Sequence, residues 1–163
     1  MIGRKGWWLI LAALLASPAK AADDPSARVD ELYNLLRFVS WPNVKSVRRV
    51  CLHRGDPLAQ PMVAMAGQGL GDDIIEVALL GQATGIRSDC DVIYFSTPHV
   101  GPVQPGKGQL LVGEGMAFAE NGGTIALFTS EGKIRFAINA RSARQSGLHI
   151  SSQVLKLAAR VIN

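Results

Sequence analysis

The sequence has few residues of the kinds that build catalytic and metal sites. Its three histidines, His53, His99 and His149, lie in unrelated segments, and neither H-x-x-x-H nor H-E-x-x-H spacing occurs. No G-x-S-x-G motif is present. In an exported hydrolase, Ser151 or Ser152 would be the nucleophile and His149 the base. Serines at helix starts, however, are typical N-caps. We therefore expect no enzyme activity, no metal and no cofactor.

An excess of charge of one sign is also missing once the N-terminal segment is set aside. The whole chain has 17 Lys and Arg against 13 Asp and Glu, a net charge of +4. Residues 1–21 contain Arg4, Lys5 and Lys20 and no acid, so 14 basic minus 13 acidic residues leaves +1. Nucleic-acid binding therefore has no electrostatic support.

The long hydrophobic run of the chain is confined to residues 7–16, which is too short for a stable membrane-spanning helix. Arg4 and Lys5 precede it, and Ala19-Lys20-Ala21 follows as a small-x-small cleavage site. This pattern predicts a cleaved signal peptide over residues 1–21, with a retained anchor as the alternative. Residues 22–163 are then left outside the cytoplasm of a bacterium, with a length that suits one domain.

Cysteine is scarce, with Cys51 and Cys90 alone in the chain. Their separation is not the spacing of metal ligands. Outside the cytoplasm, two such cysteines favour a disulfide over free thiols. A structural staple and a redox switch are both open interpretations.

The hydrophobic pattern predicts an α/β fold in a single domain, with a mixed β-sheet flanked by helices. We expect the early strands to be parallel and a C-terminal β-hairpin to be followed by two helices. The last helix begins near Ser151 and has Val154, Leu157, Ala158 and Val161 as its apolar face. Expected helices cover residues 24–41, 58–66, 116–120 and 140–146, and expected strands cover residues 47–53, 74–80, 91–96, 109–113, 124–129 and 133–138. The Pro- and Gly-rich residues 97–108 predict a loop.

Three segments carry a resemblance to a known family. Residues 134–139 read IRFAIN, residues 147–158 read GLHISSQVLKLA, and residues 33–42 read YNLLRFVSWP. Together they resemble the YfiR-like family of periplasmic regulatory proteins over nearly all of residues 22–163. The chain departs from the family in lacking a second cysteine pair and in having the loop at residues 97–108, where relatives have a helix. Redox control by that second pair therefore does not carry over.

The resemblance implies a periplasmic, non-catalytic binding protein. It would repress an inner-membrane diguanylate cyclase by binding the periplasmic domain of that enzyme, which lowers cyclic-di-GMP signalling and biofilm formation. It also implies an outer-membrane lipoprotein as a second partner, and a homodimer. The alternative is an accessory or ligand-binding module of another envelope receptor or of a histidine kinase.

Four polar residues of the C-terminal third form the candidate partner-binding site. Arg135 projects from the polar side of its strand, and Asn139 stands at the strand end. Arg141 and Arg144 are three residues apart on the following helix and share one side of it. They predict a cationic patch for an acidic partner surface or a small anion. The other interpretation is a solvated strand edge and helix face, with Asn139 as a helix cap.

Overall fold

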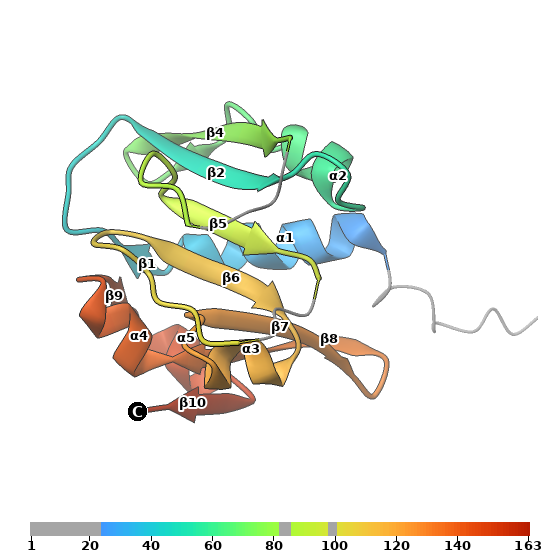
Figure 1. Ribbon diagram of the computed structural model, residues 1–163, viewed down its shortest axis with the longest axis vertical. Helices are drawn as coiled ribbons and strands as arrows, with labels where there is room; N and C mark the ends of the chain where they lie inside the picture. The colour runs from blue at the N-terminus through green and yellow to red at the C-terminus, as the bar shows by residue number, and fades with distance from the viewer. Residues whose placement is uncertain (1–23, 82–85, 98–100) are drawn as a thin grey trace, which may run out of the picture.

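An eight-stranded mixed sheet forms the centre of the computed structural model, which describes residues 24–81, 86–97 and 101–163. The predicted signal peptide at residues 1–21 lies outside the described residues. Along the sheet the strand order is β10-β8-β7-β6-β5-β2-β4-β3, and helices cover both faces (Figure 1). The predicted α/β fold with a mixed sheet and flanking helices is therefore confirmed.

The described residues form five helices and ten strands. The helices are α1 (Pro25–Leu36), α2 (Ala59–Val63), α3 (Met116–Glu120), α4 (Ala140–Gln145) and α5 (Ser152–Leu157). The strands are β1 (Val39–Ser40), β2 (Val47–His53), β3 (Gly69–Leu70), β4 (Asp73–Leu80), β5 (Val92–Phe95), β6 (Leu110–Glu114), β7 (Ile125–Ser130), β8 (Lys133–Asn139), β9 (His149–Ile150) and β10 (Arg160–Ile162). In the described part of the predicted loop, residue 97 and residues 101–108 belong to no helix or strand.

The order of the parallel strands places a crossover in the middle of the sheet. β4, β2, β5, β6 and β7 run parallel, and the chain passes from β2 to β4 on one side before it crosses to β5 on the other. β7 and β8 then form the predicted antiparallel hairpin. Its two turn residues, Glu131 and Gly132, have φ angles of 51° and 70°, as a type I′ turn requires.

Helix α1 starts as predicted but ends earlier. Asp24 caps it by accepting a hydrogen bond from the Ser26 backbone N–H at 3.0 Å, and Pro25 occupies the first turn. The expected helical continuation to residue 41 is wrong, because Val39 and Ser40 pair with β9 as an antiparallel strand. The Phe38 carbonyl extends this pairing by accepting from the Ser151 N–H. Pairing with a distant segment thus replaces the last turn of the expected helix.

The C-terminal segment also differs from the expectation. Helix α5 ends at Leu157, and Arg160–Ile162 forms β10, which pairs in parallel with β8. Val161 lies opposite Ile138, so it belongs to a strand and not to the apolar face of a helix. Leu157, expected on that face, is 71% exposed, whereas Val154 is buried. As a strand, residues 160–162 pair with the backbone of β8. Residues in a longer α5 could not make these hydrogen bonds.

The disulfide joins two strands at the crossover. Cys51 of β2 and Cys90, just before β5, are bonded, with their Cα atoms 5.9 Å apart. Both lie in the core on the sheet face that α3 covers, together with Ile93 and Phe118. The predicted disulfide is confirmed, and it ties the strands on either side of the crossover.

Candidate functional site

The structure brings only part of the predicted partner-binding site to the surface. Arg141 and Arg144 are exposed on α4, one helical turn apart, and Arg141 donates a 2.8 Å hydrogen bond to the carbonyl oxygen of Asn163. Arg135 is exposed on β8, about 13 Å along the strand from its end. We call Arg135, Arg141 and Arg144 the α4 patch. Its role in binding stays a prediction.

Asn139 lies beneath this patch, because its side chain is buried and fully used. Its Oδ1 accepts from the backbone N–H of Ser142 at 2.9 Å and so caps α4. Its Nδ2 donates to the carbonyl oxygen of Ala119 at 2.8 Å and so ties α4 to α3. Asn139 therefore positions α4, which is the cap interpretation left open above.

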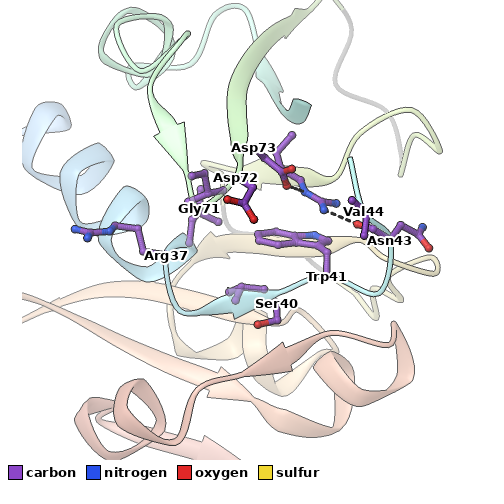
Figure 2. Close-up of a pocket in the computed structure, with 12 residues that line it drawn as sticks. Arg37, Ser40, Trp41, Asn43, Val44, Gly71, Asp72 and Asp73 are labelled. Carbon is purple, nitrogen blue, oxygen red and sulfur yellow. Dashed lines mark hydrogen bonds and ion pairs between the residues drawn. The ribbon is translucent and has the colours of Figure 1, made fainter. Parts of the chain in front are cut away.

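A second candidate is a pocket of about 350 Å³ near the end of α1 (Figure 2). It lies between β1 with the loop that follows it and the turn that joins β3 to β4. Trp41, Arg48, Gly71 and Asp72 are among the residues that line it. We call it the Trp41 pocket. Its volume is in the range of small-molecule sites.

Arg48 fixes the wall of this pocket although only 4% of the residue is exposed. Its guanidinium pairs with Asp73, donates to the Asn43 carbonyl oxygen, and lies 4.9 Å from the centroid of the Trp41 ring. Asp91 is a further carboxylate at 3.8 Å. A buried arginine with this many partners is held in one geometry, and so the stacked indole is held as well.

The groups left unpartnered in the Trp41 pocket indicate what would fit there. The Trp41 indole Nε1 is buried without a hydrogen-bond partner. Asp72 is exposed and has no partner among the described residues, and its side chain lies in the pocket near the indole (Figure 2). An orphaned N–H donor costs free energy until an acceptor reaches it. A group with a hydrogen-bond acceptor that reached this buried N–H would remove that cost.

The sequence pattern placed Trp41 at the end of the expected helix over residues 24–41 and did not predict this pocket. The pocket exists because β2 and β4 pair in register, which brings Arg48 opposite Ile75 and next to Asp73. One signal was present in the sequence. Arg48 interrupts the apolar side of a strand that is otherwise buried, and a charge at such a position needs a partner.

A third polar cluster lies where parallel strands end, around Tyr94 of β5 and Glu114 of β6. Tyr94 donates its hydroxyl to Glu114, which also accepts from Arg28 at 2.8 Å, and Arg28 donates to the Thr129 hydroxyl at 2.9 Å. Burial raises the pKa of the Glu114 carboxyl, and burial together with the Glu114 charge raises the pKa of Tyr94. The donors and acceptors of this chain satisfy one another, as in a structural network.

One of the two serines considered as nucleophiles, Ser151, has a structural role at the start of α5. The Ser151 hydroxyl accepts from the backbone N–H of Gln153 at 3.3 Å, which is the N-cap interaction predicted for it. His149 is exposed on β9. No cluster of three or more His, Cys, Asp and Glu side chains suited to a metal ion is found among the described residues. None of the helices in that part of the chain is long and apolar enough to cross a membrane.

These features define a one-domain α/β protein with a stapled sheet, an exposed cationic helix and an open pocket beside Trp41. The model of the YfiR/HmsC-like family matches residues 26–159, so the chain belongs to that family. The family is known for periplasmic regulators of diguanylate cyclases.

A solved structure at low sequence identity shares the fold. The ABC domain from Streptococcus pneumonia, in complex with L-Trp, has a TM-score of 0.55 and 14% identity, with 82% of this chain and 62% of that chain covered. The chain thus spans less than two thirds of that protein. A conserved domain protein from Vibrio cholerae has a TM-score of 0.48 and 15% identity, with 84% of this chain and 60% of that chain covered. No curated protein matches the sequence.

Proposed function

We propose that this protein is a periplasmic repressor that binds the periplasmic domain of an inner-membrane diguanylate cyclase and lowers cyclic-di-GMP synthesis. Membership of the YfiR/HmsC-like family is the observation that carries the proposal. The protein catalyses no reaction in this account. It acts by binding the inactive state of the cyclase more tightly than the active state, which shifts the balance between the two.

The α4 patch is the proposed contact with the cyclase. The side chains of Arg135 and Arg144 have no hydrogen bond or ion pair with another described residue, so their guanidinium groups are available to a partner. Arginine pairs bidentately with carboxylates, and a cationic surface steers an acidic partner toward it. Asn139 supports this contact from below because it caps α4 and anchors it to Ala119. The complex should weaken as salt rises.

Further partners follow from the same family. We propose that an outer-membrane lipoprotein competes for the protein and so releases the cyclase, and that the protein forms a homodimer. Export through the signal peptide at residues 1–21 would place all of these contacts in the periplasm.

Deletion of the gene tests the function directly. We expect the deletion strain to have more cyclic-di-GMP and more biofilm, and wild-type protein to restore both. An Arg144→Glu variant should fail to restore them and should lose binding to the purified periplasmic domain of the cyclase. Arg54→Glu is the matched control, since Arg54 is an exposed arginine outside the α4 patch whose side chain has no partner among the described residues. Unchanged cyclic-di-GMP in the deletion strain would refute the proposal.

The Trp41 pocket favours the second candidate, a ligand-binding module of another envelope receptor or histidine kinase. The observation behind it is the buried, unpartnered indole N–H beside an open volume. The chain has three tryptophans, and Trp7 and Trp8 fall in the predicted signal peptide. The fluorescence of the exported protein would then come from Trp41 alone, so a periplasmic extract of small molecules can be screened by its change. A response together with normal cyclic-di-GMP in the deletion strain would select this second function.

A further inference from the structure

One edge of the sheet is bare in the described structure. β4 pairs with β2 along seven residues on one side, but on its other side β3 covers only Asp73 and Ile74. The remaining residues of β4 run along the outer end of the sheet (Figure 1). An uncovered strand edge is a template for another strand.

The backbone hydrogen bonds show which groups are free there. The Ile74 N–H and the Leu80 carbonyl bond toward β2, whereas both backbone groups of Ile75 bond outward, to residues 67 and 68. Backbone direction alternates along a strand. Val77 and Leu79 therefore direct an N–H and a carbonyl each away from the sheet, where no described strand meets them.

The side chains along this edge do nothing to block it. Val77, Ala78, Leu79 and Leu80 are apolar and half-buried, and they contain no Pro and no charge. Natural sheets usually protect an edge with Lys, Pro, a bulge or a very short strand. The opposite edge follows that rule, because β10 has three residues and begins with the charged Arg160. The edge of β4 has the properties of an interface.

We propose that a second copy of this chain pairs with β4 in an antiparallel, two-fold symmetric ladder centred on Ala78. In this register Val77 lies opposite Leu79 of the other copy, and the two exchange both backbone hydrogen bonds. The symmetric pair repeats this, so all four free groups are satisfied. Ala78 faces its own equivalent.

The sequence of the edge favours a second copy as the occupant. Glu76 falls opposite Leu80 of the other copy, so no like charges meet across the two-fold axis. Glu76 keeps its 2.9 Å contact with Arg49 within its own chain. A register shifted toward the start of β4 would run into residues 67–70, which already occupy that side of Ile75. This inference rests on the homodimer proposed above and names its interface; a dimer that the Val77 variants leave unaffected would reject this interface and keep the homodimer.

Cross-linking tests the register. Val77→Cys and Leu79→Cys variants, carrying tags of different length and exported so that the Cys51–Cys90 bond forms, are oxidised mildly alone and mixed. Antiparallel hydrogen-bonded partners have Cα atoms about 5.5 Å apart, within disulfide range. A residue and its own equivalent at position 77 would be about 9 Å apart, beyond that range. We expect a disulfide dimer in the mixture and none in either variant alone. No mixed disulfide, or equal cross-linking in all three samples, overturns the proposal.

Sedimentation equilibrium of the unmodified protein tests the dimer itself. We expect a dimer whose dissociation constant rises at least about tenfold in Val77→Lys, because the lysine would stand on a half-buried sheet face directly opposite the apolar Leu79 of the other copy. Val77→Pro should act similarly, because the N–H it removes points outward and leaves the ladder with β2 intact. Val44→Lys is the control, since Val44 is fully exposed elsewhere. A monomer at every concentration, or a dimer unaffected by both Val77 variants with native circular dichroism, rejects the β4 interface.

Discussion

The guanidinium of Arg48 lies over the indole ring of Trp41, with its carbon atom 4.9 Å from the ring centroid. The same guanidinium pairs with Asp73 at the start of β4 and donates to the carbonyl oxygen of Asn43 in the loop after β1. One buried cation therefore holds this loop against the sheet and shapes the Trp41 pocket. The pocket and the stability of the domain depend on the same side chain.

Removing the Arg48 guanidinium should destabilise the folded protein. We expect Arg48→Met to lower the free energy of unfolding by about 3–5 kcal/mol, because the Asp73 carboxylate and the Asn43 carbonyl lose their charged donor in a buried place. Urea unfolding followed by circular dichroism measures the loss. The fluorescence of Trp41 should change in the folded variant as well, since the cation leaves the ring face.

The neighbouring arginine is the matched control. Arg49 points to the other face of β2, and its contacts with Glu76 and Asp89 lie at the surface, where its side chain is 37% exposed. Arg49→Met should cost about 0–1 kcal/mol. Equal losses of unfolding free energy in the two variants would show that the network around Arg48 contributes no more stability than the surface ion pairs of Arg49.

The disulfide should act as a staple. Cys51 and Cys90 are 39 residues apart, and closing a loop of that length stabilises by about 4 kcal/mol in the chain-entropy model. A variant with both cysteines changed to Ala should unfold at lower urea concentration and still restore repression in the deletion strain when its periplasmic level is matched to wild type.

The two interpretations of this bond predict different results. A redox switch would require that reduction change binding to the cyclase domain beyond the loss of folded protein. Titration of the folded fraction alongside binding separates the two effects. Loss of repression by a variant that is folded and present at the wild-type level would favour the switch.

Much of the sheet could be predicted from local pattern alone. β2 matches its predicted span because Val47, Val50 and Leu52 give a short apolar run with β propensity, and the hairpin follows from Glu131 and Gly132. Local pattern failed where distant segments pair. Val39 bonds to β9, and Val161 joins β8, so tertiary contacts overrode helical spacing at both places.

The candidate site could be predicted less well than the fold. Arg141 and Arg144 are exposed as expected, because helix spacing decides which side they share. The sequence allowed Asn139 to be either a partner-binding residue or a helix cap. Its buried hydrogen bond to the Ala119 carbonyl oxygen on α3 depends on the tertiary fold, which local pattern does not contain. The Trp41 pocket needed the register of β2 against β4, which no local pattern contains.

Asn139 should matter for stability before it matters for binding. We expect Asn139→Ala to cost about 2–4 kcal/mol, because α4 loses its N-cap and the buried Ala119 carbonyl loses its donor. Asn139→Asp keeps the cap acceptor and loses only the donor, so it should cost less. Urea unfolding of the three proteins gives the order. Wild-type stability in Asn139→Ala, combined with weaker cyclase binding, would instead make Asn139 a contact residue.

Glu114 should make stability depend on pH in a defined direction. Burial raises the pKa of its carboxyl in the folded protein above the ordinary value of 4.5, so the folded state holds this proton more tightly than the unfolded state. The stability that this group contributes is therefore complete below pH 4.5 and is lost as pH rises through the folded pKa. Glu114→Gln has no proton to lose.

The difference in unfolding free energy between wild type and Glu114→Gln isolates this effect from other titrating groups. Measured by urea unfolding from about pH 4 to about pH 8, the unfolding free energy of wild type should fall relative to that of Glu114→Gln as pH rises through the folded pKa of Glu114. At higher pH the difference should level off. Tyr94→Phe provides an internal check. The Tyr94 hydroxyl lowers the pKa of Glu114 through its hydrogen bond. Removing that hydroxyl should therefore shift the pH-dependent fall in stability to higher pH. A difference that does not vary with pH would mean that Glu114 titrates alike in the folded and unfolded chains.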